Sequence, residues 1–379
     1  MSQIATEGAR EQPVATRAIW LALNACPTKP SRRRLEQALQ RGEKPHEMLL
    51  ELVGQRRASG LLERAQQQIE RLSQAGIRVL CRTDTEFPAL LQTIPDPPHL
   101  LFFRGSLACL AAPTVAIVGA RRAPRVGLEI AHTLAQRLAA RGIVVVSGLA
   151  IGIDSAAHRG ALSAQGALSV QGALSAGRSI AVLGSGIDCV QPMVNRGLAR
   201  SLVAQEGLII SEYLPAQRAA PFHFPERNRL ISGVSLGVIV VEAGERSGSL
   251  ITARLALEQG REVMAVPGSL GHSNARGCHR LLKAGAALVE DERDVFDALD
   301  FLPTAAAAAA TIAPAAQQLS DALARVLTAC GPGATGIDEI CAHLGQPVMQ
   351  VSALLSELEV EGFVQRVPDG YIRRPFPPS

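Results

Sequence analysis

The sequence predicts an α/β protein with a doubly wound, mostly parallel sheet, preceded by a helical region and followed by a small unit of helices and a hairpin. Three observations indicate this fold class. Short runs of almost wholly apolar residues end in glycine or proline, amphipathic helical segments separate these runs, and the apolar spacing changes near both ends of the chain. Near-continuous apolar strands are typical of parallel sheets that helices cover on both faces.

Residues 12–75 are predicted to form a small helical domain. Apolar residues recur there at three- and four-residue spacing, the pattern of amphipathic helices, and Gly76 is a plausible helix stop. The expected helical segments are residues 18–25, 32–42, 45–55 and 60–76.

Residues 76–300 are predicted to form the sheet domain. Helices are expected between its strands, for example over residues 128–142 and 249–260. Ligands of doubly wound sheets bind outside the carboxyl ends of the strands, so the glycine-rich turns at those ends are the place to look for a site. The expected strands are residues 114–119, 143–148, 179–186, 238–244 and 262–268.

The composition after Leu302 changes to alanine and proline, which predicts a linker over residues 301–318. Residues 319–373 then give three helical segments and a hairpin turning at Asp369-Gly370, a pattern typical of winged-helix domains. This C-terminal segment has more acidic than basic groups, which argues for protein contact over duplex binding.

Composition excludes several classes of protein. The chain has 379 residues and a net charge of +4, with no apolar run long enough for a membrane span and no secretory signal at its start. Seven cysteines without a CxxC pair indicate reduced thiols, and hence a cytoplasmic protein.

Three motif matches do not carry chemistry, and a further motif is absent. Gly331–Gly336 fits GxGxxG but lies outside the sheet domain, and around Ser235 the strand follows a GxSxG match instead of preceding it. No GxxxxGK[ST] loop occurs. Cys330, Cys341 and His343 lack a fourth metal ligand. We therefore expect no catalytic residues, no metal and no cofactor.

A repeat spans residues 160–177, where GALSAQ, GALSVQ and GALSAG follow one another. Its six-residue period matches neither a solenoid nor a helix. We interpret the second and third copies as a neutral duplication at a helix end, with a new functional loop as the alternative.

The informative positions are six turns at strand ends and helix starts, where free N–H groups, hydroxyls and arginines favour anions. Plainer interpretations stay open: the first turn's arginines as solvated charges, Asp154 as an N-cap with His158 on the same helix face, and Phe222 and Phe224 as core residues. The candidate nucleic-acid-binding residues are Gly119, Arg121, Arg122, Arg125, Ser147, Gly148, His158, Gly184, Gly186, Phe222, Phe224, Arg227, Asn228, Arg229, Arg246, Ser247, Ser249, Thr252, Arg276, His279 and Lys283.

Six turns that favour anions, on one edge of one sheet, are more than a single mononucleotide would contact. A chain of phosphates would use them all, and two aromatics beside arginines are suited to stack bases and hold a backbone. Because no paired carboxylates or nucleophile stand at a catalytic spacing, binding is favoured over turnover.

At these residues the chain resembles the DNA-processing protein A family, DprA or Smf. The resemblance covers roughly residues 85–300, with PDPPHLLFFRG, VAIVGARR, SGLAIGIDSAAHRGAL, IAVLGSGID, PERNRLISG, VVEAGERSGSLITARLALEQGREVMAVPG and ARGCHRLLKAGAALVE in family order. Gln191 stands where the family usually has a tyrosine.

The resemblance implies an extended Rossmann-like fold with a SAM-like helical domain before it and a winged-helix domain after it. It also implies a homodimer, not an enzyme, that binds single-stranded DNA without sequence preference. In natural transformation such proteins protect the strand and help to load RecA. By position, it gives Arg121, Arg227 and Arg229 as DNA contacts.

Two other functions remain as alternatives. A nucleotide-processing enzyme of the phosphoribohydrolase type would share the strand–glycine turns, but its PGGxGT signature is absent and PGSLGHSN stands at that turn. A double-stranded DNA-binding transcription factor would act through the winged-helix segment.

Overall fold

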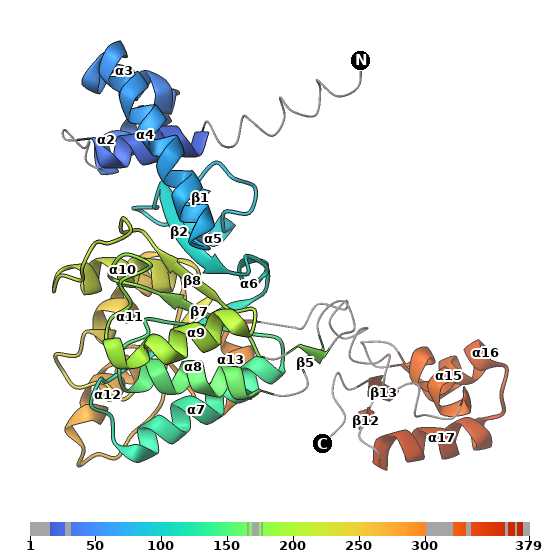
Figure 1. The fold of residues 1–379 in the computed structure, drawn as a ribbon. Helices are drawn as coiled ribbons and strands as arrows, with labels where there is room; N and C mark the ends of the chain where they lie inside the picture. Colours follow the sequence, from blue (N-terminus) through green and yellow to red (C-terminus); the bar gives the residue numbers. More distant parts are fainter. Residues whose placement is uncertain are drawn as a thin grey trace, which may run out of the picture. The chain divides into compact units, whose positions relative to one another are not determined.

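The computed structural model describes residues 16–26, 32–164, 167–168, 174–175, 177–300, 321–330, 335–360, 363–367 and 370–373. The chain divides into two compact units, one of residues 1–167 and 174–301, the other of residues 168–173 and 302–379 (Figure 1). Within the described ranges no helix is long and apolar enough to cross a membrane. The predicted linker, residues 301–318, falls outside them.

The first unit is built on a nine-stranded sheet in the order β1-β2-β8-β7-β4-β3-β9-β10-β11. All neighbours from β8 to β11 pair in parallel, whereas β1 with β2 and β2 with β8 are antiparallel. The predicted fold class is thereby confirmed, and all five predicted strands form. The strands are β1 Arg78–Cys81, β2 Leu100–Gly105, β3 Thr114–Gly119, β4 Val144–Ser147, β7 Ser179–Val182, β8 Leu208–Ser211, β9 Gly237–Val241, β10 Glu262–Ala265 and β11 Ala287–Leu288.

Helices cover both faces of this sheet because its strands are apolar on both sides. In β3, Val115 and Ile117 pack with helices α7, α8 and α13, while Ala116 and Val118 pack with α10, α11 and α12. The helices of this part are α5 Ala89–Gln92, α6 Ala108–Ala111, α7 Arg125–Ala140, α8 Ile153–Ser163, η1 Met193–Asn195, α9 Arg196–Ala204, α10 His223–Gly233, α11 Ser249–Glu258, η2 Ser273–Ala275, α12 Arg276–Lys283 and α13 Glu292–Ala298.

The N-terminal helices share a hydrophobic core with the edge of the sheet. Buried Trp20 stacks on His99 with ring centroids 4.9 Å apart, and apolar residues of the helices pack with Val79 and Phe102. Gly76 follows the last helix with φ +71°, as expected of a helix stop. The helices are residues 16–25, α2 Arg32–Gln40, α3 Pro45–Val53 and α4 Gln55–Gln74.

The second unit contains α15 Asp321–Ala329, α16 Ile337–Leu344, α17 Val348–Val360 and the antiparallel strands β12 Val364–Val367 and β13 Gly370–Arg373. Its core includes residues of all three helices and of both strands. Gly370 pairs with Val367 at the end of the ladder and is therefore part of β13. Asp369 lies outside the described residues.

The repeat begins inside α8, which ends at Ser163. Besides Ala164 and Gly177, its described remainder consists of β5 Ala167–Leu168 and β6 Leu174–Ser175, which pair as a separate two-stranded sheet. The second and third copies therefore follow the helix and do not extend it.

Candidate nucleic-acid interface

The candidate site lies at the carboxyl ends of β3 and β9, where the winding of the sheet changes direction. Strand β4 flanks β3 on one side and β9 flanks it on the other, so the loops that follow diverge and leave a crevice. Gly119 is required here because a Cβ atom would lie 1.8 Å from the Val241 carbonyl oxygen. Two pockets open at this edge.

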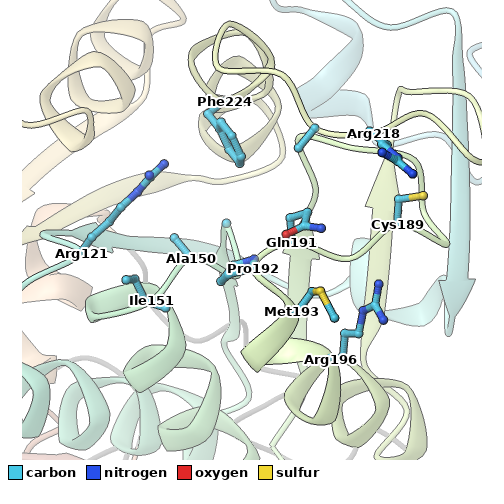
Figure 2. Close-up of a pocket in the computed structure, with 12 residues that line it drawn as sticks. Arg121, Ala150, Ile151, Cys189, Gln191, Pro192, Met193, Arg196, Arg218 and Phe224 are labelled. Carbon is cyan, nitrogen blue, oxygen red and sulfur yellow. The ribbon is translucent and has the colours of Figure 1, made fainter.

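The larger one, called here the arginine pocket, has a volume of about 660 Å³. Figure 2 shows Arg121 on one side of it and Arg196 and Arg218 on the other. All three arginines are exposed, and none forms an ion pair within the part of the chain that the structure describes. Gln191 also lines the pocket. This concentration of uncompensated positive charge favours a polyanion.

An aromatic ring separates this pocket from the next. The guanidinium carbon of Arg121 lies 5.2 Å from the ring centroid of Phe224, a cation–π distance, and both residues line both pockets. Phe224 is half-buried and extends from the first turn of α10. A flat ring beside an arginine provides a stacking surface for a base.

The second one, called here the switch-point pocket, has a volume of about 460 Å³ and a polar wall. Its deepest cation is Arg227, which is only 5% exposed. The Arg227 guanidinium donates to the carbonyl oxygens of Gly148, at 2.7 Å, and Val182, and to Asn228 Oδ1 at 3.0 Å. Arg227 thus joins the ends of β4 and β7, and its role is to position the turns. Predicted residues that also line this pocket are Gly119, Arg121, Phe224, Asn228, Ser247, Ser249 and Thr252.

Gly148 lies against Arg227 so closely that a Cβ atom there would be 2.2 Å from Nη2. The next buried group is Asp154, whose Oδ2 accepts from the backbone N–H groups of Gly148 at 3.1 Å and Ala150 at 3.3 Å. The N-cap of α8 is Gly152, so the interpretation of Asp154 as an N-cap is wrong. Burial raises the pKa of Asp154, although Arg227 opposes this effect.

His158 and Ser147 lie inside the protein, and we exclude them from the interface. His158 is 0% exposed, and its Nδ1 lies 2.8 Å from Ser179 Oγ. Burial and the charges of Arg227 and Arg159 lower the pKa of His158 to about 3, so the ring is neutral at pH 7. Ser147 Oγ donates to the Ile117 carbonyl oxygen at 2.6 Å.

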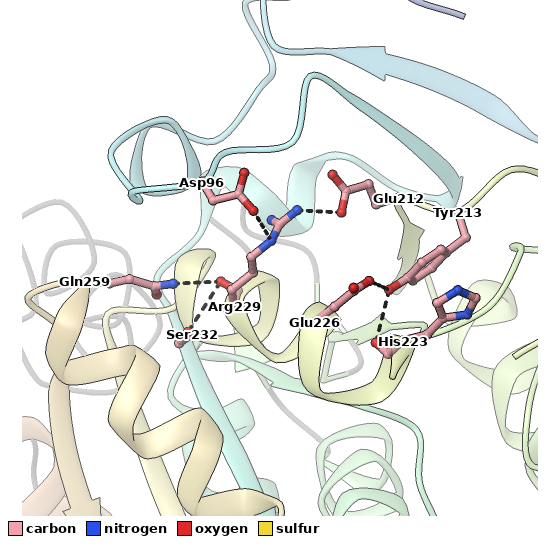
Figure 3. A network of polar contacts seen from close by, with 8 residues as sticks. All are labelled: Asp96, Glu212, Tyr213, His223, Glu226, Arg229, Ser232 and Gln259. Atoms are coloured by element: carbon pink, nitrogen blue, oxygen red, sulfur yellow. Dashed lines mark hydrogen bonds and ion pairs between the residues drawn. The ribbon is translucent and has the colours of Figure 1, made fainter. Parts of the chain in front are cut away.

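Arg229 does not face the pockets. Its side chain is 8% exposed and forms ion pairs with Glu212 at 2.6 Å and Asp96 at 3.2 Å. Figure 3 shows the guanidinium between the two carboxylates. The expectation that Arg229 contacts DNA is therefore corrected: its charge is compensated inside the protein.

The glycines of the third turn act in packing. Gly184 lies under Phe224, because a Cβ atom on this glycine would be 3.2 Å from the ring carbon Cδ1, and Gly186 lies under the loop of residues 214–217. Phe222 is 62% exposed and Phe224 is a pocket wall, so neither belongs to the hydrophobic core.

The other basic residues among the predicted binding residues lie outside the two pockets. Arg122, Arg125 and Arg246 are exposed, and Arg125 pairs with Glu129 at 2.8 Å. Arg276 pairs with Glu245 at 3.5 Å. His279 Nε2 lies 2.9 Å from the Gly268 carbonyl oxygen. Lys283 is the last residue of α12 and not part of its start.

The sequence interpretation missed Arg196 and Arg218. Arg196 is the first residue of α9, so the criterion that selected Arg276, a cation at a helix start, also applies to it. Arg218 stands in a loop whose approach to the pocket depends on tertiary structure. No three His, Cys, Asp or Glu side chains gather as metal ligands in the described ranges.

Comparisons with known proteins agree with this architecture. A family model described as DNA recombination-mediator protein A matches residues 78–300, and a DprA winged helix domain model matches residues 307–370. Protein Smf of Escherichia coli is 40% identical over 300 residues, which are 78% of this chain and 77% of that protein.

Two solved structures are also similar. The X-ray structure of DNA processing protein A from Streptococcus pneumoniae is 34% identical, with a TM-score of 0.57, and the match covers 76% of this chain and 94% of that one. A structure of the Helicobacter pylori protein, described by its single-stranded DNA binding mode, is 30% identical with a TM-score of 0.51; 60% of this chain and 97% of that one are covered.

Proposed function

We propose that this chain, which belongs to the DNA recombination-mediator protein A family, binds single-stranded DNA without sequence preference. The observation that carries the proposal is the arginine pocket, where Arg121, Arg196 and Arg218 surround an open hollow with Phe224 at its wall. Arginines hold phosphates, while an aromatic ring stacks on any base, so this combination suits an unpaired strand of any sequence. The single-stranded DNA binding described for the Helicobacter pylori protein supports the proposal.

The proposed path follows the strand ends. We infer that the backbone passes Arg196 and Arg218, that a base stacks beside Phe224 and Arg121, and that the next nucleotide enters the switch-point pocket. There the hydroxyls of Ser247, Ser249 and Thr252 offer hydrogen bonds to phosphate or sugar.

We propose binding without catalysis. Asp154, the carboxylate in the switch-point pocket, is held by two backbone N–H groups, and burial raises its pKa. It therefore acts in shaping the loop. Release of ribose from AMP by the pure protein would contradict this and favour a phosphoribohydrolase-like enzyme.

The test is binding of a fluorescent oligo-dT by the full chain at several salt concentrations. We expect the affinity to fall steeply with salt, because phosphate contacts release counterions. Arg121→Glu should lower the affinity about a hundredfold, whereas Arg254→Glu on the outer surface of α11 should change it less than about twofold. Affinity that does not depend on salt, or an unchanged Kd for Arg121→Glu, would contradict the proposal.

We further propose that the protein protects the strand and helps to load RecA during transformation and recombination, as a homodimer in the cytoplasm. The description of the family as recombination mediators supports the RecA step. The measurement is strand exchange by RecA on DNA coated with single-strand-binding protein. We expect this chain to accelerate it and Arg121→Glu to do so much less. Sedimentation of the full chain tests the homodimer.

A further inference from the structure

A third hollow adjoins the arginine pocket and belongs to neither pocket above. This helix groove, about 470 Å³ in volume, lies between α7, α8 and the η1 turn. The two helices lie side by side (Figure 1), and the groove runs from their first turns, near the strand ends, to Arg159 on the second turn of α8.

The groove is continuous with the arginine pocket. Ile151 lines both hollows, and the consecutive residues Met193 and Val194 line one each. These side chains form an apolar lip: Ile151 is 42% exposed, Met193 62% and Val194 76%. Figure 2 shows Ile151 and Met193 on the same border of the arginine pocket. A protein surface seldom gathers such side chains at one place unless something covers them.

The charges of the groove fit a phosphate backbone. Arg125 and Arg159 line it, against a single carboxylate, Glu129, which already pairs with Arg125 at 2.8 Å. Arg159 is exposed and forms no ion pair within the described ranges. The apolar lip and Arg159 thus combine an apolar surface with a positive charge. Phe224 and Arg121 combine the same two features, with an aromatic ring as the apolar surface.

We propose that the bound single strand continues from the arginine pocket over the lip of Ile151, Met193 and Val194 into the helix groove. Bases contact the apolar side chains, and Arg159 and Arg125 contact phosphates. The inference rests on the proposed function and adds to it. The stretch of DNA that one chain contacts is longer than the two strand-end pockets can hold. The helix groove contributes to affinity only when the strand is long enough to reach it.

Oligonucleotide length separates the two parts of this path. Single-strand binders occupy about 4–16 nucleotides per domain, so we compare oligo-dT of about 5 nucleotides, enough for the strand-end pockets, with oligo-dT of about 20. Arg159→Gln should weaken binding of the longer strand about fivefold and make its salt slope shallower by about 0.7. The short strand should bind as tightly as it does to the unaltered protein.

Arg125→Gln has a matched control. Arg254 forms the same kind of exposed pair, with Glu258 four residues later, on the unrelated helix α11. We expect Arg125→Gln, and not Arg254→Gln, to weaken binding of the long strand selectively. Cross-linking supplies a second readout: a photoreactive thymidine near one end of the long strand should label residues that line the helix groove and neither strand-end pocket, such as Ala156, Arg159 or Val194.

Each outcome is decisive. Equal losses for the short and long strands, no loss for either, or cross-links only at the strand-end pockets would overturn the extended path while leaving the proposed function intact. No binding of oligo-dT at either length by the unaltered chain would overturn both. A change in sedimentation of Arg159→Gln without a change in DNA binding would show that the groove receives a second copy of the chain instead.

Discussion

Arginines lie on two sides of helix α10, and the two groups differ in whether carboxylates compensate their charge. On the side of Arg229, the guanidinium meets the carboxylates of Glu212 and Asp96. On the pocket side, Arg121 over Phe224, together with Arg196 and Arg218, meets no carboxylate in the described residues. The first region has compensated charge and stabilises the protein, while the second has charge left over for a ligand.

This difference shows that an arginine close in sequence to predicted binding residues does not itself have to face the ligand. Arg227 and Arg229 are two residues apart, both are nearly buried, and only Arg227 lines a pocket. What decides the role of each is the set of acceptors that tertiary structure brings to it.

Arg229→Met should destabilise the fold by about 3 kcal/mol, because removing the buried guanidinium takes a close cationic partner from the half-buried Glu212 carboxylate. Urea unfolding measures the loss of stability. Binding of oligo-dT is measured at low temperature, where Arg229→Met is folded and should keep its affinity. In the double variant Arg229→Met/Glu212→Gln we expect part of the stability to return. A large loss of affinity in a fully folded Arg229→Met would mean that the two regions are not separate.

The stability of the protein should depend on pH through His158. Burial lowers its folded-state pKa to about 3, whereas the unfolded ring titrates near 6.5, so the unfolded state takes up the proton first as pH falls. The stabilisation is complete above pH 6.5 and decreases below it, by about 2 kcal/mol between pH 7 and pH 5.

His158→Gln retains a donor for Ser179 and cannot titrate, so its unfolding free energy should fall less over the same range. Urea unfolding of both proteins at several pH values gives the difference. Parallel pH curves for the two proteins would show that His158 is not held neutral in the fold.

Phe224→Ala should weaken binding of oligo-dT by about 1–2 kcal/mol, roughly five- to thirtyfold in Kd, because one stacking surface is lost. Phe222→Ala is the matched control: Phe222 precedes the same helix, is 62% exposed and lines neither pocket. Fluorescence anisotropy compares the two variants. Equal losses would shift the proposed path from the pocket to the outer surface of α10.

Arg218→Gln should lower the affinity for oligo-dT about fivefold and make the salt slope shallower by about 0.7, as expected for one lost phosphate contact. Arg276→Gln should leave both quantities unchanged, because Arg276 lines neither of the two pockets nor the helix groove. Salt titrations of the two variants provide the comparison. If Arg276→Gln had the larger effect, the strand would pass the start of α12 instead of the arginine pocket.

The alternation of strands and helices, the glycine turns, and the edge of the sheet where the candidate site lies could all be predicted from the amino-acid sequence. These follow from local spacing: apolar runs must be buried, and glycine is needed where chains approach closely, as at Gly119 and Gly148.

Which arginines lack an ion pair in the described residues depends on contacts between segments that are distant in the chain. Asp96 and Glu212 stand far from Arg229 in the chain, and Arg218 reaches the pocket from a loop far from Arg121. Whether a charge is compensated depends on the groups within a few ångströms of it. Sequence spacing does not set those neighbours between distant segments, so only folding could place Arg196 and Arg218 opposite Arg121 and turn Arg229 inward.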